Sequence, residues 1–240
     1  MQYCENIIVN SLSIKNLTNK INKNLLKDKI VKISYYEKNY EHFFLQLSQK
    51  IGTLMPMEEN IKTGNKTGNL FVDIKYAKNK SNSFLHSNTR QPFHTDGSYE
   101  SNPPDLTFFF CKKQAKYGGS TIFINNKDLI KICKCYNFKM YQHLISKKLS
   151  FFKGNDKREK EIIDKKLNLN WNYFRVEKTP LVEDFHAFLE HKIFDGGLYE
   201  NINLKEGEGI IFNDNKFLHG RTSFIGNRWL KKGGIKWILK

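Results

Sequence analysis

The sequence predicts a mainly β fold of the jelly-roll or barrel kind, with helices packed outside the sheets. Short apolar runs bounded by turn residues recur along the chain, at 69–74, 106–111, 120–124, 169–176, 202–204, 209–212, 218–224 and 228–238. Such runs are typical of β-strands, and glycine or proline pairs such as Gly118-Gly119 separate several of them. Many short strands joined by glycine-rich turns favour a jelly roll or barrel over a parallel α/β sheet.

Three further segments carry apolar residues at the spacing of an α-helix. These helices are expected at 41–51, 128–149 and 182–194. Gly52 directly follows the first of them and is a plausible end for it. The highly charged segment 153–166 is expected to be a surface excursion, and the polar segment 58–69 a loop.

One domain accounts for the whole chain. Its 240 residues are enough for one well-buried core, and no internal repeat or low-complexity linker divides them. We therefore expect a single domain over residues 1–240. Residues 1–68 would form a mixed, partly helical N-terminal decoration, and 69–240 the β core with a helical insert near 126–195.

The charge of the chain permits several partners. A formal net charge of +16 is compatible with nucleic acid, an acidic membrane or an anionic substrate. Lys outnumbers Arg 35 to 5, however, and the lysines are spread from Lys15 to Lys240. This usage is typical of A+T-rich coding, so we expect a solvated basic surface and no nucleic-acid partner. No apolar run approaches the roughly 18 residues of a membrane span, so no membrane partner is expected.

Cysteine usage indicates a reduced compartment. The chain has four cysteines, Cys4, Cys111, Cys133 and Cys135. Their spacing fits neither a disulfide framework nor the usual zinc knuckle. The first ten residues also lack the basic and then apolar pattern of a signal peptide. We therefore expect a cytoplasmic protein.

Two histidines and one aspartate form the most informative pattern. His94 and Asp96 stand two residues apart in a strand-like segment, so their side chains would project to the same side. His219 follows far downstream in the segment Phe217–Thr222. Two imidazoles and one carboxylate can occupy one face of an octahedral Fe(II) ion and leave the other face open for a co-substrate and O₂. These three residues, called the triad below, indicate an oxygen-activating iron enzyme.

Four ordered blocks around the triad match a known family. They are His94-Thr95-Asp96-Gly97, Gly118-Gly119-Ser120-Thr121, the segment Leu204–Phe224 that contains His219, and Arg228-Trp229-Leu230-Lys231-Lys232. With these blocks the chain resembles the taurine dioxygenase (TauD/TfdA) and clavaminate synthase-like family of Fe(II)/2-oxoglutarate-dependent oxygenases. The resemblance covers about residues 84–232. It implies a cupin-like jelly roll, the double-stranded β-helix, with flanking helices.

The resemblance also implies cofactors and their ligands. The triad would bind Fe(II), with 2-oxoglutarate and O₂ as co-substrates. Arg228 would hold the far carboxylate of 2-oxoglutarate through two parallel hydrogen bonds, and the Thr121 hydroxyl would add another. Arg221, two residues after His219, is a second candidate for anion binding, although it could instead brace the turn.

The expected reaction is hydroxylation or desaturation, with release of CO₂ and succinate. Asp96 is retained here, whereas the related halogenases carry a small residue at that position. The expected substrate is a small polar molecule, such as an amino acid or an amine-carboxylate. Asn88, Tyr99 and Arg175 are candidates for the substrate pocket because they lie near the metal block or in a predicted strand.

Two other functions stay open. The basic charge suggests a nucleic-acid oxidative demethylase, although those enzymes usually carry a second downstream arginine and none follows Arg228 here. A catalytically inactive β-barrel that acts as a binding module is the other alternative, because Gly233-Gly234 is expected to interrupt the final strand. His186 and His191 are expected to be packing or surface residues, since a spacing of five places them on different helix faces. The oligomeric state is left open.

Overall fold

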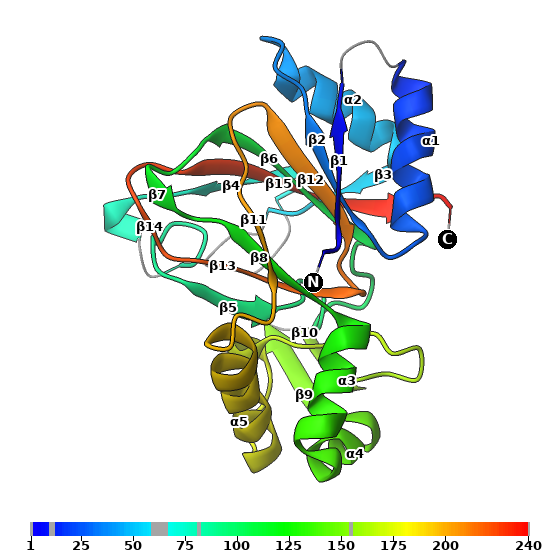
Figure 1. Cartoon of the computed structure of the whole chain (residues 1–240), viewed down its shortest axis with the longest axis vertical. Helices are drawn as coiled ribbons and strands as arrows, with labels where there is room; N and C mark the ends of the chain where they lie inside the picture. Colours follow the sequence, from blue (N-terminus) through cyan, green and yellow to red (C-terminus); the bar gives the residue numbers. More distant parts are fainter. Residues whose placement is uncertain (1, 10–12, 59–66, 81–82, 154–155, 240) are drawn as a thin grey trace.

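Two β-sheets face each other, and helices lie at both ends of the molecule (Figure 1). The structure is a computed structural model that describes residues 2–9, 13–58, 67–80, 83–153 and 156–239. The larger sheet has the strand order β1-β2-β12-β6-β15-β3, with β4 also paired to β15. The smaller sheet has the order β11-β8-β13-β5. This architecture confirms the predicted mainly β fold with flanking helices.

The strands coincide with most of the predicted apolar runs. The larger sheet contains β1 (Cys4–Ile8), β2 (Ile30–Ser34), β3 (Gly52–Met55), β4 (Phe71–Lys75), β6 (Leu106–Lys113), β12 (Glu208–Asn213) and β15 (Trp229–Trp237). The smaller sheet contains β5 (Gln91–His94), β8 (Thr121–Asn125), β11 (Glu200–Ile202) and β13 (Phe217–Arg221). A separate short pair joins β7 (Tyr117–Gly118) to β14 (Phe224–Ile225).

Aromatic side chains fill the space between the two sheets. Phe212 of the larger sheet meets Phe123 of the smaller sheet edge to face, with ring centroids 4.9 Å apart. Phe109 stacks on Phe212 at 5.9 Å, and all three rings are buried. Burying an aromatic side chain of this size stabilises a fold by roughly 1.5–3 kcal/mol. This inter-sheet core therefore fixes the separation at which residues of the two sheets can meet.

The N-terminal part covers the outer face of the larger sheet. Its helices are α1 (Ile14–Leu25) and α2 (Tyr40–Ile51). Leu17 of α1 and Phe44 of α2 pack with Phe108 and Ile211 of the sheet in one buried cluster. Gly52 ends α2 as predicted. Because β1, β2 and β3 also hydrogen-bond into the larger sheet, the first part of the chain contributes strands as well as helices.

A helical insert covers the outer face of the smaller sheet (Figure 1). It contains α3 (Asn126–Tyr136), α4 (Phe138–Ser146), the hairpin of β9 (Lys148–Lys153) and β10 (Asp156–Glu161), α5 (Pro180–Ala187) and a π-helix over Phe188–Phe194. Leu129, Leu144 and Phe185 of the insert pack with Ile122 and Leu218 of the sheet. Among the described residues, no helix is both long enough and apolar enough to cross a membrane.

The prediction of one helix over 128–149 is wrong. The chain forms α3 and α4 instead, and Asn137 separates them with an extended backbone at φ −154°. The Asn137 side-chain oxygen accepts a hydrogen bond from the Met140 backbone N–H at 2.9 Å, which begins α4. Asparagine therefore ends one helix and caps the next, whereas the apolar spacing continues unbroken across it.

The structure adds detail to one further prediction and corrects another. The charged segment 153–166, expected to be a surface excursion, contains β10, whose residues 157–159 are exposed and which pairs with β9 in an antiparallel hairpin. The segment 169–176 is not a regular strand. Trp171 instead exchanges hydrogen bonds with Thr95, and a short 3₁₀ helix (η2, Tyr173–Arg175) follows. The predicted loop at 58–69 lies largely outside the described residues.

Gly233 and Gly234 do not interrupt the last strand. β15 runs unbroken through both glycines, because it pairs with β6 on one side and with β4 and β3 on the other. A Cβ on Gly233 would lie 2.5 Å from Phe108, and one on Gly234 would lie 2.4 Å from Met57. The two glycines are therefore needed for close packing. The strand that carries most of the motif Arg228–Lys232 is continuous.

The junction between the N-terminal strands and the β core depends on Glu208. Its carboxylate lies 2.7 Å from Lys32 Nζ and accepts hydrogen bonds from the Tyr36 hydroxyl and the Lys205 N–H. Burial raises the pKa of Glu208, but these partners outweigh burial and lower the pKa below its usual range. We expect Glu208→Gln to lower the free energy of unfolding by about 1–3 kcal/mol at pH 7.

This effect should depend on pH in a defined direction. A carboxyl group with a lowered pKa stabilises the fold above its unfolded pKa and loses this contribution as the pH falls. The difference in the free energy of unfolding between wild type and Glu208→Gln should therefore shrink below about pH 4.5, which is the usual pKa of glutamate. Urea unfolding at pH 7 and pH 4 measures it, with the exposed Glu159→Gln as the matched control. Equal stability of wild type and Glu208→Gln at pH 7 would contradict the assigned role.

Candidate metal centre

Antiparallel strand pairing brings the two triad histidines together. β5 and β13 are neighbours in the smaller sheet, and His94 lies directly opposite His219 in their register. The imidazole centroids are 4.2 Å apart, and both residues are buried. Residues that are far apart in the sequence therefore meet across a single pair of strands.

Asp96 completes the cluster from the turn that follows β5. Its Oδ1 lies 3.7 Å from His94 Nε2, and its Oδ2 lies 3.6 Å from His219 Nε2. One ligand atom from each of the three residues lies within 4.8 Å of the other two. The prediction that His94 and Asp96 share one strand is not met, since β5 ends at His94. The carboxylate nevertheless lies on the same side as the imidazole.

Polar groups face the far ring nitrogen of both imidazoles, so that Nε2 points to the cluster. His94 Nδ1 lies 2.9 Å from the Pro92 carbonyl, which can only accept, so Nδ1 is the donor. His219 Nδ1 lies 3.2 Å from Oδ1 of Asp214. Such partners on the far ring nitrogen are typical of histidines that bind metals. The donor set and its orientation therefore fit a first-row divalent cation such as Fe(II).

The charge states of the cluster are also those of metal ligands. Burial and the neighbouring His219 lower the pKa of His94 to about 3, so this imidazole is neutral at pH 7. Burial raises the pKa of Asp96, but Lys232 and the two histidines together lower it below its usual range. A neutral imidazole and an ionised carboxylate are the forms that coordinate a metal.

Two residues at this centre were not found by sequence reasoning. Asp214 follows β12, and its Oδ2 accepts a hydrogen bond from the Asp96 backbone N–H at 2.8 Å. Lys232 lies in β15, with Nζ 2.5 Å from Asp96 Oδ1. A usable signal for Lys232 was present, because it follows Arg228 by four residues and alternate residues of a strand share a face. Asp214 gave no comparable signal.

Arg228 and Thr121 lie beside the triad. A small cavity of about 40 Å³ is lined by His94, His219, Thr121, Arg228 and Lys232, among others. Arg228 is 6% exposed, and none of the acidic side chains in the described ranges forms an ion pair with it. Burial, together with a neighbouring arginine, lowers the pKa of Arg228 to about 9.

The backbone near Arg228 also leaves room for its side chain. Gly119 has φ +75°, and a Cβ on it would lie 2.9 Å from the Arg228 Cδ. A side chain at this position would therefore displace the guanidinium. A buried guanidinium with no carboxylate partner is poorly stabilised in the protein alone and is suited to bind an anionic ligand.

Known proteins share the fold of this chain and part of its sequence. The family model described as "Taurine catabolism dioxygenase TauD, TfdA family" matches residues 38–131. An asparagine oxygenase, solved in complex with Fe(II), 2S,3S-3-hydroxyasparagine and succinate, superposes with a TM-score of 0.75 at 13% identity, covering 92% of this chain and 79% of the other. The predicted TauD/TfdA resemblance is confirmed.

Two curated proteins are similar to this chain in sequence. The dioxygenase str8 of Strobilurus tenacellus is 25% identical over 185 residues, which cover 66% of this chain and 43% of that protein. The 3-((Z)-2-isocyanoethenyl)-1H-indole synthase of Fischerella ambigua (strain UTEX 1903) is 23% identical over 181 residues, covering 65% of this chain and 66% of that protein. The chain thus matches less than half of the first relative and about two thirds of the second.

Arg221 also lines the cavity at the triad, but backbone carbonyls already occupy its guanidinium. Its guanidinium donates hydrogen bonds to the backbone carbonyls of Phe84, Ser87 and Thr89 at 2.8–3.0 Å. These bonds attach the segment before β5 to β13. The geometry favours the bracing role, and anion binding by Arg221 stays a prediction.

The three substrate-pocket candidates lie in different surroundings. Asn88 is exposed, and its carbonyl accepts a hydrogen bond from the Phe224 N–H. Tyr99 is buried, and its hydroxyl accepts a hydrogen bond from Lys153 at 3.0 Å. Arg175 ends the 3₁₀ helix η2 and is partly buried. The residues that line the cavity at the triad do not include any of these three candidates, so their roles stay predictions.

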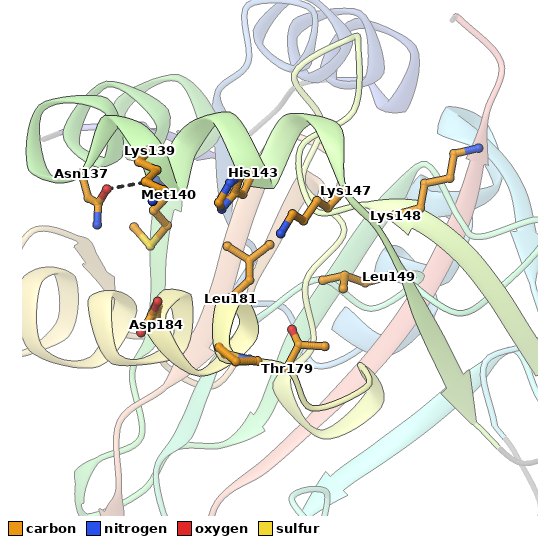
Figure 2. Close-up of a pocket in the computed structure, with 11 residues that line it drawn as sticks. Asn137, Lys139, Met140, His143, Lys147, Lys148, Leu149, Thr179, Leu181 and Asp184 are labelled. Carbon is orange, nitrogen blue, oxygen red and sulfur yellow. Dashed lines mark hydrogen bonds between the residues drawn. The ribbon is translucent and has the colours of Figure 1, made fainter.

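The remaining histidines and a second hollow lie apart from the centre. His186 stacks on Tyr173 with centroids 3.7 Å apart, and His191 pairs with Asp195 on the surface, as expected for packing and surface residues. A hollow of about 640 Å³ lies between α4 and α5, lined by His143 and other residues (Figure 2). None of the residues that line it belongs to the triad, so its larger size does not make it the chemical centre.

Proposed function

We propose that this protein is a non-haem Fe(II)/2-oxoglutarate-dependent dioxygenase that hydroxylates or desaturates a small polar substrate. For hydroxylation, the substrate R–H, O₂ and 2-oxoglutarate give R–OH, CO₂ and succinate. The observation that carries the proposal is the meeting of His94, Asp96 and His219, which line or adjoin the same cavity as Arg228 and Thr121.

Each residue has a distinct role in this proposal. The triad would hold Fe(II) on one face and leave the opposite face for the co-substrates. When bound, Fe(II) with 2-oxoglutarate and O₂ supplies the oxidising chemistry. Arg228 would pair with the far carboxylate of 2-oxoglutarate, and Thr121 would donate a further hydrogen bond. Asp214 would keep the imidazole of His219 and the backbone of Asp96 in place.

An amino acid or amine-carboxylate is the proposed substrate class. The similar asparagine oxygenase was solved with a hydroxylated amino acid and succinate. The Lys232 ammonium also borders the cavity and could attract an anionic group on a substrate. Asn88, Tyr99 and Arg175 remain candidates for contacts with the rest of the substrate. A cytoplasmic location is part of the same proposal.

Spectroscopy without oxygen tests the proposal. Fe(II) and 2-oxoglutarate would be titrated anaerobically into the protein, and a visible metal-to-ligand absorption band is expected. Succinate release would then be screened with a panel of amino acids, with Asp96→Ala as the control. A well-folded wild type that shows neither the band nor substrate-dependent succinate release would refute the assignment.

A further inference from the structure

Lys232 contacts the metal-binding carboxylate directly. Its Nζ lies 2.5 Å from Asp96 Oδ1, and the two side chains are 13% and 14% exposed. Among the described residues, Lys232 is the only lysine or arginine that forms an ion pair with Asp96. The charge of the triad carboxylate is therefore already balanced by a side chain of the protein.

The position of Lys232 in β15 explains its contact with Asp96. Leu230 and Lys232 of β15 line the cavity at the triad, as does Arg228 immediately before the strand. Lys231 projects to the other side, where its Nζ lies 3.3 Å from Asp73. Two adjacent lysines on one strand thus lie in different environments, and only one of them reaches the metal ligands.

We infer that Lys232 competes with the metal ion for Asp96. A divalent cation bound to Asp96 and an ammonium group at hydrogen-bonding distance from the same carboxylate repel each other. A metal ion that takes Oδ1 therefore displaces the Lys232 Nζ, and one that takes Oδ2 weakens this ion pair by repulsion. A flexible four-carbon side chain with a compact charge can make such a movement. The inference rests on the proposed metal site and adds a residue that sets its affinity.

This competition has two consequences. Without a metal, Lys232 stabilises the fold, because an ionised carboxylate in this little-exposed position would otherwise lack a counter-charge. With a metal, the lost or weakened ion pair reduces the net binding free energy. The same side chain therefore makes the metal-free protein more stable and the metal affinity lower.

Metal titration of Lys232→Met tests the inference. We expect the Kd for Co(II) alone, measured by calorimetry on chelator-treated protein, to fall about tenfold or more relative to wild type, because the repelling charge is gone. We also expect the metal-free variant to unfold at a temperature roughly 4–10 °C lower, and saturating Co(II) to remove most of this difference. Lys232→Gln is a second variant in case Lys232→Met folds poorly, because its amide can donate to Asp96 without a charge.

Lys231→Met is the matched control, since it removes the same charge from the neighbouring position. It should leave the Kd for Co(II) within about twofold of wild type, whereas a general charge effect would change both variants alike. An unchanged or increased Kd in the Lys232 variants would overturn the inference and leave the proposed function intact. No Co(II) binding by wild type or any variant would overturn the proposed metal site as well.

Discussion

Replacing His219 with alanine is expected to lower the affinity for Fe(II) at least about 100-fold and to stop succinate formation. His219 supplies one of three protein ligands, and Asp96 and His94 alone would hold the cation weakly. Metal content after desalting, together with Co(II) calorimetry, measures the loss. His219→Gln should show the same loss, because its amide is a much weaker metal ligand.

The control for this experiment is another histidine of the same chain. His143 lines the hollow between α4 and α5 and has no place in the triad (Figure 2). His143→Ala should retain the metal content and the activity of wild type. If His219→Ala folded normally and kept the wild-type Kd for Co(II), the triad would not be the metal site.

Replacing Arg228 with methionine is expected to raise the Kd for 2-oxoglutarate about 100-fold or more. Two charge-assisted hydrogen bonds at a buried position contribute about 3 kcal/mol or more together, and a factor of ten corresponds to about 1.4 kcal/mol. Arg228→Lys should lose about tenfold, because lysine keeps the charge but not the paired geometry. Anaerobic titration of the Fe(II)-loaded protein with 2-oxoglutarate, followed by the visible band, measures both values.

Metal affinity and stability distinguish a role of Arg228 in binding 2-oxoglutarate from a purely structural role. The Kd for Co(II) alone should change little in Arg228→Met. The metal-free variant should be as stable as wild type or more stable, because the wild-type guanidinium is buried and has no carboxylate partner within the described part of the chain. The exposed Arg158→Met on β10 is the control and should bind 2-oxoglutarate like wild type. An unchanged Kd for 2-oxoglutarate in Arg228→Met would refute the assignment.

Local patterns predicted the strands near the site because these strands carry their own signals. The segments 106–111 and 209–212 are compact apolar runs, and they form β6 and β12, which are central in the larger sheet. The same local patterns failed at Asn137, where a single capping side chain ends one helix and begins another. They also failed at Gly233-Gly234, because the strand there is held by its neighbours and not by its own propensity.

The sequence by itself determined the mainly β fold and the ligand types of the centre, since strand periodicity and the identity of a metal ligand are properties of single segments. Only the tertiary structure decided that His94 and His219 lie opposite each other, that Asp214 supports both His219 and Asp96, and that Lys232 reaches the carboxylate. Except for the contact between Asp214 and His219, these contacts join strands and turns that are more than a hundred residues apart. Their register is set by the packing of two sheets, which no local pattern encodes.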